Sequence, residues 1–180
     1  MTIITAFSHL SVQVRDIDKV LPFYRYVFGL HVSVDREQSF SAPGPDGRRI
    51  DFRRREVYLR WADAPGSPFI VLGQHLNGEQ EGGPTPLQGI GFDHVAFYVT
   101  DVDAVVERAR ESGARMIAGP KNNDGPSYGH PGEATVRTAL FYDPEGNVLQ
   151  IDRWLDTGSV PARTGPDAAD GAEGTDGTDG

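Results

Sequence analysis

Two histidines, His9 and His94, occupy the same place in a phrase that the sequence contains twice. The phrases read FSHLSVQVRDIDKV and FDHVAFYVTDVDAV, and histidine stands third in both. Histidine ring nitrogens bind metal ions, and they also transfer protons near neutral pH. A histidine that recurs in this way indicates that two copies of one structural unit each contribute a polar side chain to a site.

The residues after each histidine alternate between apolar and polar side chains, as they do in a half-buried strand. One face of each strand can therefore pack against a helix, while the other face carries His9 in the first copy and His94 with Tyr98 in the second. The apolar faces consist of Leu10, Val12 and Val14 in the first copy and Val95, Phe97 and Val99 in the second.

A helix is expected after each of these strands. Asp16 or Asp18 can cap the first helix, KVLPFYRYVFG, which ends at Gly29. Asp101 or Asp103 can cap the second, AVVERARESG, which ends at Gly113. Three strand-like segments follow each helix, and a turn sequence, DAPG or DPEG, precedes the last of them. This pattern predicts an α+β fold of two βαβββ modules.

The order of these segments predicts the domain organisation. Residues 1–77 form the first module, residues 78–90 a polar linker rich in glycine and proline, and residues 91–156 the second module. Residues 157–180 are rich in glycine and aspartate and have almost nothing to bury, so we expect a disordered acidic tail.

The composition excludes several classes of function. Cysteine is absent, so the protein has no disulfide framework, thiolate metal site or cysteine nucleophile. The formal net charge of -9, without a basic stripe, argues against a nucleic-acid partner. We see neither a signal peptide nor an apolar run of bilayer length, so we expect a cytoplasmic protein with no membrane partner.

The repeated unit, the FYRYVFGL ending of the first helix and the FYDPEGNVLQI segment resemble the vicinal oxygen chelate superfamily, also called glyoxalase/bleomycin resistance/dioxygenase. The resemblance extends from about Phe7 to Trp154. It implies that the two modules form a cup-shaped mixed sheet with the helices on the outer face, and that a divalent metal ion binds on the concave face.

In this superfamily the metal ligands lie on the first and last strands of each module. The resemblance therefore assigns His9, His94 and Gln150 as ligands, while Val71 holds the remaining position and cannot bind a metal. Three ligands would leave coordination positions open for a substrate. The ion expected is Fe²⁺, Mn²⁺, Ni²⁺ or Zn²⁺. The vacancy at Val71 resembles the extradiol dioxygenases and favours dioxygenase-like chemistry. Those enzymes carry a glutamate where Gln150 stands, and its absence favours glyoxalase- or epimerase-like chemistry, so both stay open.

Two further side chains are candidate catalytic residues. Tyr98 shares the face of His94 and could donate a hydrogen bond to a substrate oxygen, although it could equally pack in the cavity. His130, in a loop with turn chemistry, could act as a general acid or base above the cup, or it could be a solvated loop histidine. A group of arginines is interpreted as a charged edge strand, with attraction of an anionic substrate as the alternative: Arg48, Arg49, Arg53, Arg54 and Arg55.

These features favour a small-molecule metalloenzyme, whose substrate would chelate the ion through two neighbouring oxygens. The alternative is a metal-free binding or sequestration protein that resembles the bleomycin resistance proteins. The partner expected in either case is a small molecule, and the assembly expected is a homodimer. The sequence leaves open whether the modules pair within one chain or between two chains.

Overall fold

The computed structural model describes residues 3–4, 6–78, 80 and 82–156. The first module contains β1 (His9–Gln13), α1 (Ile17–Phe28), β2 (His31–Pro43), β3 (Arg49–Arg60) and β4 (Phe69–His75). The second contains β5 (Val95–Tyr98), α2 (Val102–Glu111), β6 (Met116–Asp124), the short 3₁₀ helix η1 (Pro126–Tyr128), β7 (Thr135–Tyr142) and β8 (Val148–Trp154). The predicted acidic tail, residues 157–180, lies outside the described residues.

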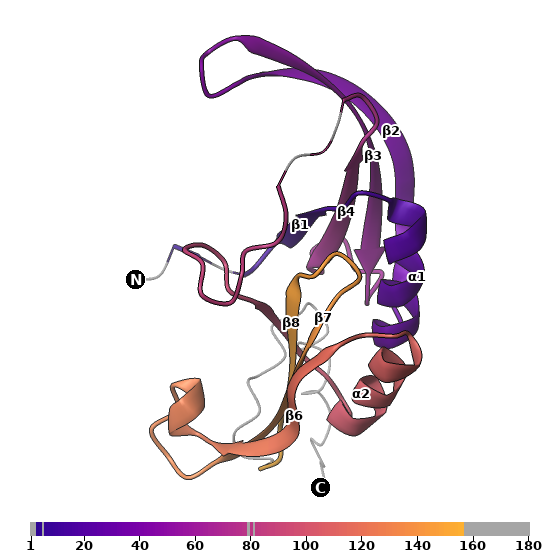
Figure 1. The fold of residues 1–180 in the computed structure, drawn as a ribbon. Coiled ribbons are helices and arrows are strands. Elements are labelled where there is room, and N and C mark those ends of the chain that lie inside the picture. Colours follow the sequence, from indigo (N-terminus) through magenta and orange to yellow (C-terminus); the bar gives the residue numbers. More distant parts are fainter. Residues whose placement is uncertain (1–2, 5, 79, 81, 157–180) are drawn as a thin grey trace, which may run out of the picture.

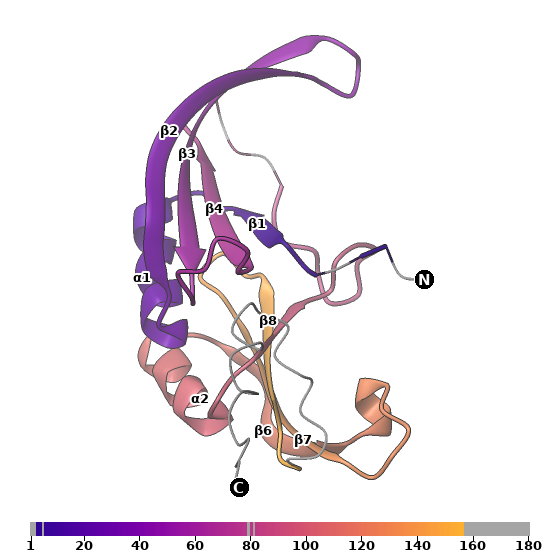
Figure 2. The ribbon, with the colours of Figure 1, turned by 180° about the vertical axis from the view of Figure 1, so that it is seen from behind.

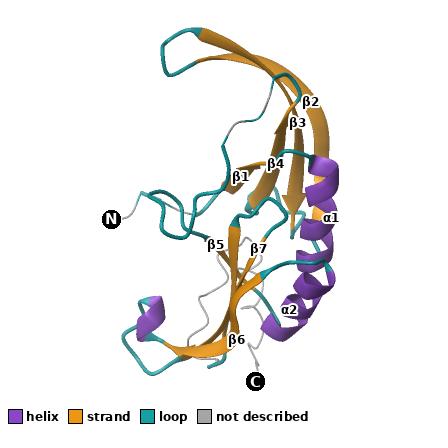
Figure 3. Ribbon diagram, in the orientation of Figure 1, coloured by secondary structure: helices purple, strands orange, loops and turns teal. Residues whose placement is uncertain are grey.

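The strands form two four-stranded mixed sheets with the same topology. The strand orders are β1-β4-β3-β2 and β5-β8-β7-β6, and in each sheet the first strand pairs parallel to the last while the other pairs are antiparallel. Both helices lie along the outer, convex side of the molecule (Figures 1 and 3), and the view from behind shows the same curved arrangement (Figure 2). The predicted α+β fold of two βαβββ modules with outer helices is confirmed.

Each helix begins at an aspartate cap that the sequence predicted. The side chain of Asp16 accepts a hydrogen bond from the backbone nitrogen of Asp18, and that of Asp101 accepts one from Ala104. Helix α1 ends at Gly29, whose φ of 67° is a left-handed conformation that favours glycine. In the described part of the chain, no helix has the length and apolar character needed to cross a membrane.

One hydrophobic core joins the two modules within a single chain. Aromatic side chains of α1 reach the second sheet: the ring centroids of Phe28 and Phe97 are 5.2 Å apart, and those of Phe23 and Phe141 are 6.3 Å apart. Fully buried residues of both modules belong to this core. The two modules of one chain therefore share a common core.

A buried hydrogen bond also links the modules. The hydroxyl of Tyr24, on α1, donates to Asp143 Oδ2 at 2.9 Å, and Tyr24 is only 1% exposed. Burial raises the pKa of Tyr24 well above its ordinary value, and the charge of Asp143 acts in the same direction. The phenol therefore stays protonated and donates this bond across the physiological pH range.

Replacement of Tyr24 by phenylalanine should lower the free energy of unfolding by about 1.5–3 kcal/mol, because the substitution removes a hydrogen bond to a charged group. The control is Tyr26→Phe: Tyr26 also donates to a carboxylate, Glu111, but it is half exposed, so its loss should cost under about 1 kcal/mol. Urea denaturation of both variants measures the difference. Equal losses would show that the buried bond contributes no more than the exposed one.

The interpretation of the arginines as an edge strand is wrong. Strand β3, which carries Arg53, Arg54 and Arg55, lies inside its sheet and pairs with β2 on one side and β4 on the other. The arginines instead form ion pairs with carboxylates that flank them, since Arg54 contacts Glu56 and Arg55 contacts Asp18 and Asp35. The pKa of Arg55 is raised above its ordinary value, mainly by its hydrogen-bonded ion pair with Asp35.

Candidate functional site

The inner face of the second sheet forms a polar cavity of about 640 Å³. Three neighbouring strands meet there in register: Tyr98 of β5 and Thr138 of β7 stand on either side of Asp152 of β8. Since side chains alternate along a strand, Gln150 and Asp152 point to the same face of β8. The polar residues that line the cavity are His94, Tyr98, Lys121, Asn123, Ser127, Tyr128, Thr138, Gln150 and Asp152.

Asp152 is the centre of a hydrogen-bond network in this cavity. Its side chain is almost fully buried, and Oδ1 accepts a hydrogen bond from the Tyr128 hydroxyl at 2.9 Å. The Gln150 amide nitrogen lies 3.0 Å from Oδ1 and 2.9 Å from Oδ2. Burial raises the pKa of Tyr128, and the neighbouring Asp152 carboxylate also raises it, so the phenol remains a donor.

Asp152 and Tyr128 were not among the site residues predicted from the sequence. Asp152 stands two positions after Gln150, so strand alternation alone could have placed its carboxylate on the inner face. No comparable signal marked Tyr128, because η1 reaches the cavity only through the folding of the connection between β6 and β7.

The two candidate catalytic residues lie in different surroundings. Tyr98 lines the cavity, is 64% exposed, and accepts a hydrogen bond from Trp154 Nε1 at 3.2 Å. His130 is not among the residues that line the cavity; its ring packs edge-on against Trp154, with centroids 5.6 Å apart, and its Nδ1 accepts from the backbone nitrogen of Gly132. The catalytic roles of Tyr98 and His130 stay predictions.

The structure brings two of the three predicted metal ligands to one cavity. His94 and Gln150 both line the second-module cavity, and His94 Nδ1 lies 2.6 Å from Asp93 Oδ2. His9 is absent from the lining; its ring stacks on Phe69 with centroids 4.9 Å apart, and its Nδ1 lies 3.1 Å from Ser8 Oγ. His9 therefore lies in the aromatic surroundings of the first sheet.

The strand registers show which first-module residue corresponds to Gln150. Gln150 pairs with Ala96, two residues after His94, and Val71 pairs with Ser11, two residues after His9. Val71 thus occupies the equivalent position, as the sequence alignment of the modules proposed. Its side chain has no ligand atom, so the inner face of the first module offers no counterpart to Gln150.

The side chains as they lie do not fit a three-ligand metal centre. Among the described residues, no group of three or more histidine, aspartate or glutamate side chains could hold a metal ion. The Gln150 amide nitrogen is turned towards Asp152, which orients this amide by hydrogen bonding. The ligand set His9, His94 and Gln150 stays a prediction.

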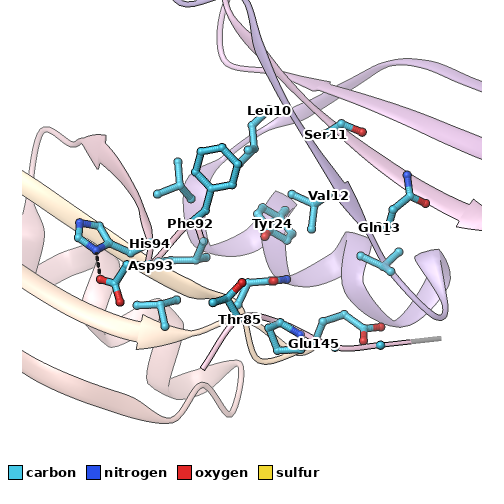
Figure 4. A pocket seen from close by; sticks show the side chains of 18 of the residues that line it. Leu10, Ser11, Val12, Gln13, Tyr24, Thr85, Phe92, Asp93, His94 and Glu145 are labelled. Atoms are coloured by element: carbon cyan, nitrogen blue, oxygen red, sulfur yellow. Dashed lines mark hydrogen bonds and ion pairs between the residues drawn. The ribbon is translucent and has the colours of Figure 1, made fainter. Parts of the chain in front are cut away.

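A second cavity of about 580 Å³ lies between the modules (Figure 4). Its walls are mostly apolar and come from β1, the linker and the residues that lead into β5, including Leu10, Val12 and Phe92. At one end the Arg15 guanidinium pairs with Glu145, and Arg15 Nη2 donates to the backbone oxygen of Gly82 at 2.8 Å. The largely buried carboxylate of this cavity, Glu145, is paired with an arginine, unlike Asp152 of the second-module cavity.

Comparisons with solved structures agree on the fold. A glyoxalase family protein from Bacillus cereus superposes with a TM-score of 0.64 at 18% identity, covering 86% of this chain and 97% of its own. A point mutant of glyoxalase I from Zea mays gives 0.54 at 18% identity, covering 81% of this chain and 44% of its own. A glyoxylase/bleomycin resistance protein/dioxygenase domain from Frankia sp. EAN1pec gives 0.51 at 23% identity, covering 82% and 90%.

At these identities the structural similarities show the fold alone. No curated protein is significantly similar to the sequence. The family model "Glyoxalase/Bleomycin resistance protein/Dioxygenase superfamily", however, matches residues 6–151, which include both modules from the strand of His9 to the strand of Gln150. The chain therefore belongs to the glyoxalase/bleomycin resistance protein/dioxygenase superfamily.

Proposed function

We propose that the protein binds a small organic molecule in the cavity of the second module. The observation that carries this proposal is the buried Asp152 carboxylate, which Tyr128 and Gln150 orient on the wall of a cavity of about 640 Å³. Cavities of this size, with a few fixed polar groups, are typical of small-molecule sites. Hydrogen bonds within the protein hold these groups before a ligand arrives, which lowers the entropic cost of binding.

A ligand in this cavity would meet an aromatic surface as well as polar groups. Tyr98 exposes most of its ring at the cavity wall, and the Trp154 indole fixes its hydroxyl. A planar group could stack on this ring while its polar atoms reach Asp152 or Gln150. Binding without a metal ion, as in a sequestration protein, needs no side chain beyond those that the cavity already holds.

A metalloenzyme that binds a substrate through two neighbouring oxygens is the second candidate. The observation that favours it is the presence of His94 and Gln150 in one cavity. It requires His9, which now stacks on Phe69, as the third ligand. Dioxygenase-like and glyoxalase- or epimerase-like reactions are both consistent with this candidate.

Metal analysis separates the two candidates. Protein purified without chelators and then dialysed against Mn²⁺, Fe²⁺, Ni²⁺ or Zn²⁺ should retain well below one equivalent of ion, because His9 stacks on Phe69 and does not line the cavity that His94 and Gln150 share. Elemental analysis measures the metal content, and His31→Ala, which removes a partly exposed histidine paired with Asp63, is the control for nonspecific binding. One equivalent that is lost in His9→Ala and His94→Ala, but kept in His31→Ala, would establish the metalloenzyme instead.

Ligand screening tests the binding site itself. Small molecules that raise the melting temperature should lose affinity when Tyr98 is replaced by alanine, because the exposed stacking surface is removed. An effect of about 3–30-fold is expected for one aromatic contact together with its buried area. Leu10→Ala, on the wall of the inter-module cavity, is the matched control. If affinity falls in Leu10→Ala and not in Tyr98→Ala, the ligands bind in the cavity between the modules.

We also propose that the chain forms a homodimer. Several large apolar side chains near the linker are exposed, among them Phe92 at 95% and Phe7 at 62%, and a second copy could cover them. Light scattering at micromolar concentration should give a mass near twice 19.6 kDa. A single-chain mass that persists as the concentration rises would contradict this expectation.

A further inference from the structure

Three buried carboxylates occur among the described residues, and their partners differ. Glu56 forms ion pairs with Arg36 and Arg54, so its charge is balanced by cations. Asp143 accepts hydrogen bonds from two backbone nitrogens, from the Asn147 amide and from Tyr24, so its lone pairs are occupied. Asp152 has fewer partners than either. This difference sets Asp152 apart from carboxylates that serve the fold.

Asp152 retains capacity to accept further hydrogen bonds. An ionised carboxylate offers about four acceptor sites, and here the Tyr128 hydroxyl and a single Gln150 amide group supply the donors. No arginine, lysine or histidine in the described ranges forms an ion pair with Asp152. Lys121 lines the same cavity, but its side chain is exposed. Burying a carboxylate without a cation costs free energy, which a cationic ligand would recover.

A second buried group beside Asp152 also lacks a partner. Thr138 is 1% exposed, pairs in register with Asp152, and its Oγ1 has no partner at hydrogen-bond distance within the described structure. The threonine nevertheless lies near enough to Tyr128 to offset part of the rise that burial causes in the pKa of that phenol. Because Thr138 lines the cavity, a polar hydrogen of a ligand could reach this oxygen. Two neighbouring acceptors of this kind match a group that carries several N–H donors.

Aromatic rings stand around the same carboxylate. Tyr98 pairs in register with Asp152, Tyr128 donates to it, and Trp154 follows it by two residues on the same face of β8. Trp154 contacts both tyrosines: its Nε1 donates to the Tyr98 hydroxyl, and its ring lies edge-on to Tyr128 with centroids 6.1 Å apart. Aromatic faces attract organic cations through their negative π-face, most strongly where water is excluded.

We propose that the ligand of the second-module cavity carries a protonated amine that pairs with Asp152, donates to Thr138 Oγ1 and lies against Tyr98, whose hydroxyl Trp154 holds in place. This inference rests on the proposed function and names the class of ligand. The net charge of -9 acts in the same direction, because it concentrates cations near the protein. An alkyl- or arylalkylammonium compound therefore fits the site better than a neutral or anionic analogue of the same shape.

Three probes of matched shape test this inference: benzylamine, benzyl alcohol and benzoate, titrated into the nitrogen-15-labelled full chain at pH 7. Benzylamine should shift the Trp154 indole and Gln150 side-chain amide signals, with saturation at millimolar concentration, while the indole signal of Trp61 in the first module stays unchanged. Benzyl alcohol and benzoate should bind at least about tenfold more weakly, since neither supplies a cation.

Variants establish the contact with Asp152. Asp152→Asn preserves the shape but removes the charge, and should weaken benzylamine binding at least about tenfold. Glu133→Gln removes the same charge from an exposed position in the loop before β7, and should leave the affinity unchanged. If Asp152→Asn does not fold, Tyr98→Ala decides, with a loss of about threefold or more expected from the missing ring.

The outcomes distinguish failure of the ammonium inference from failure of the proposed function. If benzyl alcohol or benzoate shifts the cavity signals as strongly as benzylamine, the cavity binds small molecules but the ammonium class is wrong. If benzylamine produces no shift, or if Asp152→Asn or Tyr98→Ala leaves its affinity unchanged, the ammonium class is likewise overturned. In both cases the library screen with Tyr98→Ala and Leu10→Ala still decides whether the cavity is the binding site.

Discussion

Replacing Asp143 with alanine should lower the free energy of unfolding by about 3–5 kcal/mol, because it leaves several buried donors without an acceptor. Asp143 is 5% exposed and belongs to the DPEG turn before β8. Its Oδ1 accepts from the backbone nitrogens of Glu145 and Asn147, and its Oδ2 accepts from Asn147 Nδ2 and the Tyr24 hydroxyl. The substitution therefore disrupts the turn and the contact between the modules together.

The first module provides the control for this prediction. Asp63 opens the DAPG turn at the equivalent place before β4, but its side chain is 94% exposed and contacts only His31 in the described structure. Asp63→Ala should therefore change stability by less than about 1 kcal/mol. Urea denaturation of both variants compares the two turns directly. Similar losses would mean that the turn sequence, and not the burial of its aspartate, determines the cost.

The elements of the fold could be predicted because local sequence determines them. Alternating side chains marked the strands that follow His9 and His94, and the capping aspartates Asp16 and Asp101 marked the helix starts. The repeat then required the same unit twice. Strand alternation and helix caps depend on neighbours within a few residues, so a single sequence is enough to predict them.

Properties that depend on strand order could not be predicted in the same way. Arg53, Arg54 and Arg55 suggested an edge strand, yet β3 lies between β2 and β4. A strand inside the sheet tolerates these charges because Glu56 of the same strand pairs with Arg54, and because the fold brings Asp18 and Asp35 to Arg55 from other elements. Whether a strand lies at the edge or inside a sheet depends on pairing with strands that are distant in the sequence. A local charge pattern does not determine that pairing.

The candidate site combines both kinds of information. Periodicity placed His94 and Tyr98 on one inner face, and the resemblance to the superfamily added Gln150; all three line the same cavity. Tyr128 enters through the long connection after β6, and so the network around Asp152 was not predicted. Equivalence in the repeat suggested that His9 would join His94, but the packing of Phe69 determines where its ring lies.

Among substitutions in the candidate site, replacing Gln150 with glutamate should cause the largest loss of stability. The Gln150 amide nitrogen donates to both oxygens of Asp152, so the substitution exchanges a donor for a second carboxylate about 3 Å away. We expect a loss of about 2–4 kcal/mol in stability near pH 8 in the presence of a chelator. Gln13→Glu, the same change at an exposed position of β1, should cost under about 1 kcal/mol.

The loss in Gln150→Glu should depend on pH with a defined sign. Two adjacent carboxylates raise one folded-state pKa above its unfolded value, so the penalty is absent below the unfolded-state pKa, grows as the pH rises from that value to the folded-state pKa, and is constant above it. The variant should therefore approach the wild type near pH 4–5, as urea denaturation across this range would show. A pH-independent difference would mean that the two carboxylates do not interact.

A divalent ion should relieve the same repulsion. Glutamate at position 150 would join Asp152 and His94 on one cavity, giving three side chains of the types that bind Zn²⁺ or Mn²⁺. Adding either ion should therefore raise the melting temperature of Gln150→Glu, and calorimetry should give one ion per chain. Gln13→Glu and the wild type should not respond. Equal, one-to-one binding by the wild type would instead show that Gln150 itself is a ligand and that His9 moves to complete the set, which would restore the metalloenzyme as the leading function.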